Sequence, residues 1–274
     1  MTDNELGVFL RLRRAALSPT DVGLPAGARR RTEGLRRAEV ATLSGVSVEY
    51  LTRLEQGRDR RPSVQVVNSL SGVLRLTMAE RAHLYRLTKT ADGAFSCVAH
   101  SETPSRDVRP GVQATLERLG PGPAVLLNRL GEVLAYTEGY GRLMGEAGVL
   151  AGDPPSLPRF VFGSPNARKV FPDWDEVADE QVSALKQGPF RAEPEAAALA
   201  DELERLAGDA FTKRADTLPG LPRAHGLLRV EHPLMGLLRL RYETLLLSED
   251  DRQRIVVYLP DDALTTSALD ALLT

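Results

Sequence analysis

The stretch from Leu35 to Gly57, LRRAEVATLSGVSVEYLTRLEQG, decides the fold of the first part of this 274-residue chain. Its apolar residues recur at helical spacing in two short blocks, and they predict two helices that pack together through Val40, Leu43, Val46, Leu51 and Leu54. Between the blocks, Gly45 can adopt the positive φ of a tight turn, and Ser47 can cap the second helix by accepting a backbone N–H. This layout predicts a helix-turn-helix, whose second helix enters the major groove of DNA.

The phase of the second helix predicts which side chains reach base edges. Four residues project away from the apolar side in its N-terminal half: Val48, Glu49, Thr52 and Arg53. An arginine can donate two hydrogen bonds to guanine, a glutamate can accept one from cytosine, and a valine can contact a thymine methyl group. For Glu49 an alternative stays open, because an acid in the first turn also favours the helix dipole.

Phosphate contacts are expected on either side of these residues, where they would fix the register on DNA without reading sequence. The candidates are Arg30, Arg31, Arg37, Ser47, Tyr50, Arg58, Arg60 and Arg61. The arginine run before the helix-turn-helix is equally consistent with a solvated loop, and Tyr50 is equally consistent with packing inside the domain.

The distribution of charge supports a polyanionic partner for the first third of the chain. The net charge is −2, but residues 1–90 carry 16 Lys and Arg against 9 Asp and Glu, a net +7, and the remainder is net −9. A basic surface gains affinity for DNA by releasing condensed counterions. The acidic remainder would be repelled by DNA.

Helical patterns over residues 4–17, the two helix-turn-helix blocks, 63–74 and 77–90 predict an all-α domain of five helices at residues 1–90, with a long loop at 18–34. Residues 91–110 contain Gly93, Pro104 and Pro110 and are predicted to be a linker.

A second domain is predicted at residues 111–274. Apolar runs predict strands at 124–128 and 133–137, with Gly131 in the turn, and at 226–231, 235–247 and 254–259. Helices are predicted at 138–145, 173–186 and 194–207, and a proline-rich connection at 150–165. Two strands, a helical insertion and three strands give the chain order of a PAS domain, so the fold class is α+β with a five-stranded antiparallel sheet.

Several stretches resemble one known family. In the first domain they are GVFLRLRR (7–14), RRTEGLRR (30–37) and YLTRLEQGR (50–58), and in the second they are LNRLGEVLA (127–135), FPDW (171–174), His232-Pro233 and LRYET (240–244). Together they resemble the MmyB-like transcription regulators, which join an Xre-type helix-turn-helix to a PAS-like domain. The resemblance implies a small-molecule sensor, with a fatty-acid-like effector as one possibility.

Candidate ligand contacts in the second domain are Asn128, Arg168, Trp174, Leu240 and Arg241, although core packing or a surface ion pair is an ordinary alternative for each. No catalytic residues are expected, because the chain contains no G-x-S-x-G, P-loop or G-x-G-x-x-G motif. No metal site or cofactor is expected either, since the four histidines lack ligand spacing and Cys97 is the single cysteine.

The sequence therefore predicts a ligand-responsive transcription regulator that binds double-stranded DNA. We expect a homodimer on a palindromic operator, a small-molecule effector, no membrane partner and a cytoplasmic, nucleoid-associated location. One alternative is a DNA-binding protein whose C-terminal domain serves only dimerisation or protein interaction. A second is an enzyme with a regulatory DNA-binding head.

Overall fold

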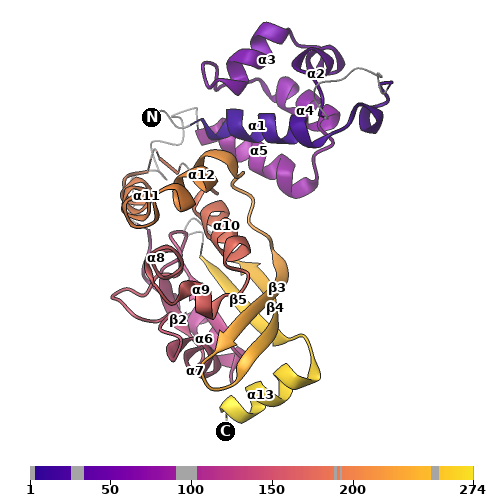
Figure 1. Ribbon diagram of the computed structural model, residues 1–274. Helices are drawn as coiled ribbons and strands as arrows, with labels where there is room; N and C mark the ends of the chain where they lie inside the picture. Colours follow the sequence, from indigo (N-terminus) through magenta and orange to yellow (C-terminus); the bar gives the residue numbers. More distant parts are fainter. Residues whose placement is uncertain are drawn as a thin grey trace. The chain divides into compact units, whose positions relative to one another are not determined.

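The computed structural model describes residues 4–25, 34–90, 104–187, 190–191, 193–247 and 253–273 (Figure 1). The chain forms two compact units. The first contains residues 1–101 with the short segments 186–193 and 215–221, and the second contains 102–185, 194–214 and 222–274. Much of the predicted linker, residues 91–103, lies outside the described residues, as do the loop arginines Arg30 and Arg31.

The first unit is helical, as the sequence predicts. Its helices are α1 Glu5–Ala16, a 3₁₀ helix Pro19–Val22, α2 Arg37–Ser44, α3 Val48–Glu55, α4 Val64–Val73 and α5 Met78–Thr90. Their apolar faces meet in one core around Phe9, Leu10, Val40, Leu51, Leu54, Leu70 and Leu84. The prediction for Leu43 was wrong, because this side chain is 40% exposed, while Ala41 beside it is buried.

The second unit is α+β. Its elements are α6 Pro110–Leu119, β1 Ala124–Leu127, β2 Val133–Tyr136, α7 Glu138–Gly145, α8 Leu157–Gly163, α9 Ala167–Val170, α10 Trp174–Leu185, α11 Pro194–Ala207, α12 Asp209–Thr217, β3 His225–His232, β4 Gly236–Leu246, β5 Arg254–Pro260 and α13 Ala263–Leu273. The last three residues of α12 fall in a segment of the first unit.

The five strands form one antiparallel sheet in the order β2-β1-β5-β4-β3. All five strands, the β1–β2 turn and helices α7, α10 and α11 lie where the sequence predicts them. The proline-rich stretch at 150–165 is a correction, because it contains α8. There Ser156 caps the helix and Pro158 stands in its first turn, where the missing N–H of proline costs nothing.

The two faces of the sheet differ in what covers them. Val112 and Leu116 of α6 pack on one face against Ala124, Leu126 and Ile255 of β1 and β5. The opposite face points towards α10, α8 and α7. Along β4 the residues Leu238, Leu240, Tyr242 and Thr244 alternate with exposed ones and lie on this second face, as the period-2 pattern predicts.

Candidate DNA interface and ligand pocket

The turn before α3 has the geometry that its sequence predicts. Gly45 has φ +70°, which a residue without Cβ adopts at no steric cost. The Oγ of Ser47 accepts a hydrogen bond from the backbone N–H of Tyr50 at 3.0 Å and so caps α3. Leu51 and Leu54 are buried, which fixes the rotation of α3 and determines the face that it exposes.

The exposed face of α3 carries the four predicted base contacts. Val48 is 39% exposed, Glu49 and Arg53 are exposed, and Thr52 is half-buried. The Thr52 hydroxyl donates to the carbonyl of Val48 at 2.7 Å. The Arg53 guanidinium carbon lies 5.4 Å from the ring centre of Tyr50, within cation–π range. The two longest of these side chains, the acidic Glu49 and the basic Arg53, stand one helical turn apart.

A buried carboxylate anchors the end of α3. Glu55 is 1% exposed, and its oxygens pair with Arg14 Nε at 2.7 Å and Arg37 Nε at 2.6 Å. Its backbone carbonyl accepts from Arg11 and from Asn4 Nδ2. This role of Glu55 was not predicted, although its spacing from Leu51 and Leu54 places it on the buried side of α3.

Several of the arginines predicted to contact phosphates already have partners within the first unit. Arg37 is 43% exposed, yet its Nε is already engaged with Glu55. Beyond α3, Arg58 is exposed, Arg60 Nε donates to the carbonyl of Gly57 at 3.0 Å, and the backbone N–H of Arg61 donates to Asp59 at 3.3 Å. Tyr50 is half-buried, and burial raises the pKa of its hydroxyl.

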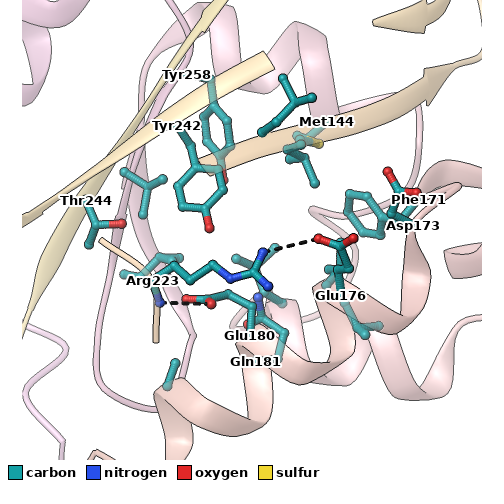
Figure 2. Close-up of a pocket in the computed structure, with 18 of the residues that line it drawn as sticks. Met144, Phe171, Asp173, Glu176, Glu180, Gln181, Arg223, Tyr242, Thr244 and Tyr258 are labelled. Atoms are coloured by element: carbon teal, nitrogen blue, oxygen red, sulfur yellow. Dashed lines mark hydrogen bonds and ion pairs between the residues drawn. The ribbon is translucent and has the colours of Figure 1, made fainter. Parts of the chain in front are cut away.

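The second unit contains a cavity between α10 and the sheet (Figure 2). Its volume is about 100 Å³. The apolar part of its wall comes from Leu127, Tyr140, Met144, Leu157, Val161, Phe171, Val177, Ala184, Leu227, Leu228 and Val256. The polar part comes from Asp173, Glu176, Glu180, Gln181, Arg223, Arg229, Tyr242, Thr244, Arg254 and Tyr258. A concave site whose wall combines apolar side chains with convergent polar groups is typical of small-molecule binding.

Ion pairs line one side of this cavity. Arg223 Nη1 lies 3.2 Å from Glu176 Oε2, and the Arg223 backbone N–H donates to Glu180 at 3.0 Å (Figure 2). Arg229 pairs with Asp173. Burial raises the pKa of Glu180, and burial together with the Glu180 charge raises the pKa of Tyr242 to about 12. Burial therefore disfavours the charged form of both groups.

The inner wall holds a buried guanidinium. Arg254 is 9% exposed and donates from Nη1 to the carbonyl of Asn128 at 3.2 Å. Among the described residues no carboxylate lies within 4.0 Å of it, and desolvation lowers its pKa. Tyr140 is fully buried, and its hydroxyl has no hydrogen-bond partner within the described part of the chain. These groups retain unused capacity to bind a polar atom of a ligand.

A family model described as the MmyB-like transcription regulator ligand binding domain matches residues 108–272, more than half of the chain. The chain belongs to the MmyB-like transcription regulators. A helix-turn-helix domain model matches residues 5–84. No curated protein matches the chain. This MmyB-like protein is thus a DNA-binding transcription regulator, with its DNA-binding helices in the first unit and a ligand-binding domain in the second.

None of the five residues that the sequence analysis chose for the ligand is among those lining the cavity of this MmyB-like domain. Leu240 and Trp174 are core residues, and Arg168 stacks on the Trp174 ring at 3.7 Å. Arg241 lies on the outward face of β4 and pairs with Asp261 at 2.7 Å. On β4 the residues that line the cavity are Tyr242 and Thr244.

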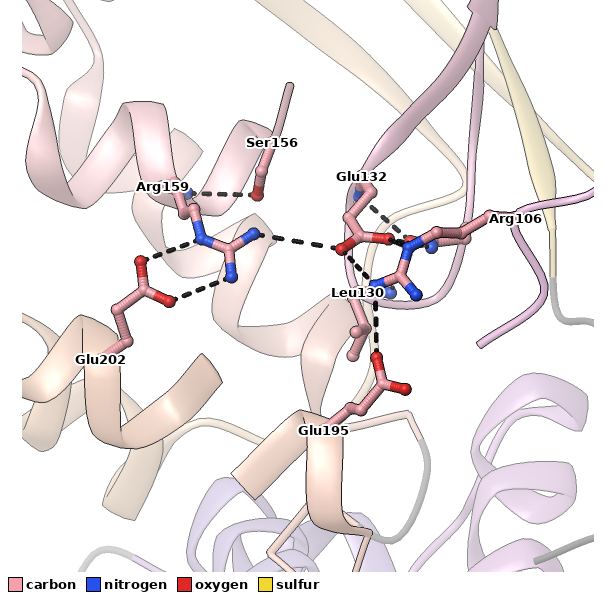
Figure 3. Close-up of polar contacts among 8 residues, drawn as sticks. Arg106, Leu130, Glu132, Ser156, Arg159, Glu195 and Glu202 are labelled. Atoms are coloured by element: carbon pink, nitrogen blue, oxygen red, sulfur yellow. Dashed lines mark hydrogen bonds and ion pairs between the residues drawn. The ribbon is translucent and has the colours of Figure 1, made fainter. Parts of the chain in front are cut away.

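Asn128 instead organises the β1–β2 turn. Its Oδ1 accepts the backbone N–H groups of Leu130 and Glu132, and its Nδ2 donates to Glu132 at 2.7 Å. Glu132 is buried and continues into a network with Arg106 and Arg159, which also pair with Glu195 and Glu202 (Figure 3). This network joins the turn to α8 and α11, and it holds the Asn128 carbonyl that Arg254 contacts.

Two further observations concern alternative functions of this MmyB-like protein. Among the described residues no three His, Cys, Asp or Glu side chains gather in a way that would hold a metal ion. Within the same residues, no helix has the length and apolarity needed to cross a bilayer.

Proposed function

We propose that this MmyB-like protein is a homodimeric regulator that binds a palindromic operator and is controlled by a small amphipathic effector. The observation that supports the effector is the cavity between α10 and the sheet, which lies inside the matched ligand-binding domain. The protein would act as a binding protein without catalysis, in the cytoplasm where the chromosome lies. An effector can control it only by binding one conformation better than another.

The walls of the cavity favour an effector that combines an apolar body with an acidic head. Met144, Phe171 and Val256 offer apolar surface. Arg254 offers a buried positive charge, and pairing with a carboxylate would compensate its desolvation. A fatty-acid-like molecule has this chemistry, and its head group would lie at Arg254.

Native mass spectrometry of the purified protein, followed by thermal melts with dodecanoate, tests this proposal. A ligand at one hundred times its dissociation constant stabilises the folded state by ~2.7 kcal/mol. We expect dodecanoate to raise the melting temperature, methyl dodecanoate to act more weakly because it has no charge, and Arg254→Met to remove the difference between them. If no small molecule co-purifies and neither probe stabilises the protein, the C-terminal domain is a dimerisation or interaction module.

Selection of bound sequences from random DNA tests the operator. A two-fold protein should select two inverted half-sites whose centres are about one helical turn, 34–36 Å, apart or a multiple of that spacing. Recovery of a single unrepeated half-site would contradict the palindromic operator while leaving DNA binding intact.

A further inference from the structure

The outward face of the C-terminal sheet exposes large apolar side chains on three adjacent strands. Leu227 of β3 is 44% exposed, Leu237 and Leu245 of β4 are 49% and 48% exposed, and Leu259 of β5 is 50% exposed. Large exposed apolar patches on a domain mark interaction surfaces. Leu237, Leu245 and Leu259 are not among the residues that line the cavity between α10 and the sheet, so the ligand pocket does not account for their exposure. Leu227 does line the cavity, while the strand register places it beside the outward-facing Arg241.

The outward residues of β4 form a nearly symmetric series. In order they are Leu237, Arg239, Arg241, Glu243 and Leu245. Leucines stand at both ends, opposite charges stand at the second and fourth places, and Arg241 stands at the centre. The strand register places Leu227 and Leu259 on either side of Arg241.

We propose that this face binds the same face of a second copy of the chain, with β4 antiparallel to β4 and the two-fold axis crossing Arg241. In such an isologous contact every pair of different residues occurs twice. Because outward residues are evenly spaced along a strand, Arg239 of one copy lies opposite Glu243 of the other. Leu237 likewise lies opposite Leu245. Leu227 and Leu259 lie along the axis and meet their own counterparts.

Charge complementarity identifies the partner as a second copy. The contact brings two Arg239–Glu243 pairs together, one on each side of the axis. The central Arg241 would meet its own counterpart, but Asp261 compensates its charge at 2.7 Å within the same chain. Asp261 and Asp262 also lie 3.0 and 3.4 Å from Arg239. Face-to-face sheets keep their strand directions within about 30° of each other, which maintains this pairing along the length of β4.

Sedimentation equilibrium of the full chain tests the leucine row. Leu227→Arg and Leu259→Arg each place a charge at the axis next to its own copy, and we expect the dissociation constant of the dimer to rise about tenfold or more. Leu264→Arg is the matched control, because Leu264 is 84% exposed and lies on α13 rather than on a strand of the sheet. Its dimer should keep the wild-type affinity. If the two interface variants match the control, the proposed face is wrong.

A charge exchange tests the register. Arg239→Glu and Glu243→Arg should each weaken the dimer, because each variant places like charges opposite each other twice. The double variant restores opposite charges and should recover most of the lost affinity, which a merely structural role of either side chain would not produce. If the double variant loses as much dimer affinity as the two single variants lose together, the antiparallel register is wrong.

This inference rests on the proposed homodimer, and the two can fail separately. A wild-type chain that is monomeric up to high concentration contradicts both. A wild-type dimer that survives all of these substitutions contradicts only the interface and leaves the homodimer of the proposed function intact.

Discussion

At the scale of single residues, Arg53 is the strongest candidate for reading a base. It is exposed on α3, and the ring of Tyr50 lies 5.4 Å from its guanidinium. Arg53→Ala should cost ~1–3 kcal/mol of binding to the selected operator and much less on random DNA. Fluorescence anisotropy with both DNAs at one salt concentration measures the difference. Equal losses on both DNAs would make Arg53 a phosphate contact.

A second residue-scale effect concerns His83, which is 1% exposed and packs edge-on against Phe9 at 5.1 Å. Burial, with a smaller contribution from Arg86, lowers its pKa from 6.5 to about 4. Between these values the unfolded chain binds more protons than the folded one, so stability should fall as the pH drops from 6.5 to 4. The loss reaches on the order of 3 kcal/mol by pH 4, where the folded state also binds the proton.

Urea unfolding at several pH values, monitored on the first unit, checks this effect. His83→Leu should flatten the pH dependence of the unfolding free energy between pH 4 and 6.5. A wild-type and a His83→Leu protein with the same pH profile would show that His83 titrates normally.

At the scale of elements, local signals predicted most of the fold. The α3 cap at Ser47, the turn at Gly45 and the period-2 strands depend on neighbouring residues, and all are confirmed. The helices α6, α8, α9, α12 and α13 were missed, because they are short, rich in proline or flanked by linkers. The residues that line the pocket were missed for a different reason. Its wall forms only when α10 packs across from β4 and β5, and no local pattern encodes that contact.

The cap of α3 also gives an element-scale prediction. Ser47→Ala removes the acceptor for the Tyr50 N–H and should destabilise the first unit by ~1 kcal/mol, whereas Ser47→Gly should cost only a few tenths of that amount. Ser47→Asp keeps a capping oxygen and adds a negative charge. If Ser47 approaches a phosphate, the Asp variant should be as stable as wild type and yet bind DNA more weakly. Unchanged DNA affinity would remove Ser47 from the phosphate contacts.

At the scale of the whole molecule, the proposed regulation requires an empty cavity rather than a filled core inside the second unit. Two alanines of α10 distinguish these cases. Ala184 lines the cavity, while Ala178 is fully buried on the same helix and does not line it. Replacing each alanine by leucine therefore compares a site that lines the cavity with a site in the packed core. Both changes are made in the same helix, so the change in helix propensity is the same.

Ala178→Leu should overpack the core and cost ~1–3 kcal/mol, as added methyl groups do in a well-packed interior. Ala184→Leu should be tolerated, because its added atoms enter the cavity. The Ala184→Leu protein should also bind the operator with an affinity that no longer changes with dodecanoate, since the effector and the leucine compete for one space. Thermal melts and operator titrations with and without dodecanoate measure both effects. Equal destabilisation by the two substitutions would mean that the space at Ala184 is closed in solution, and control by an effector in this pocket would then fail.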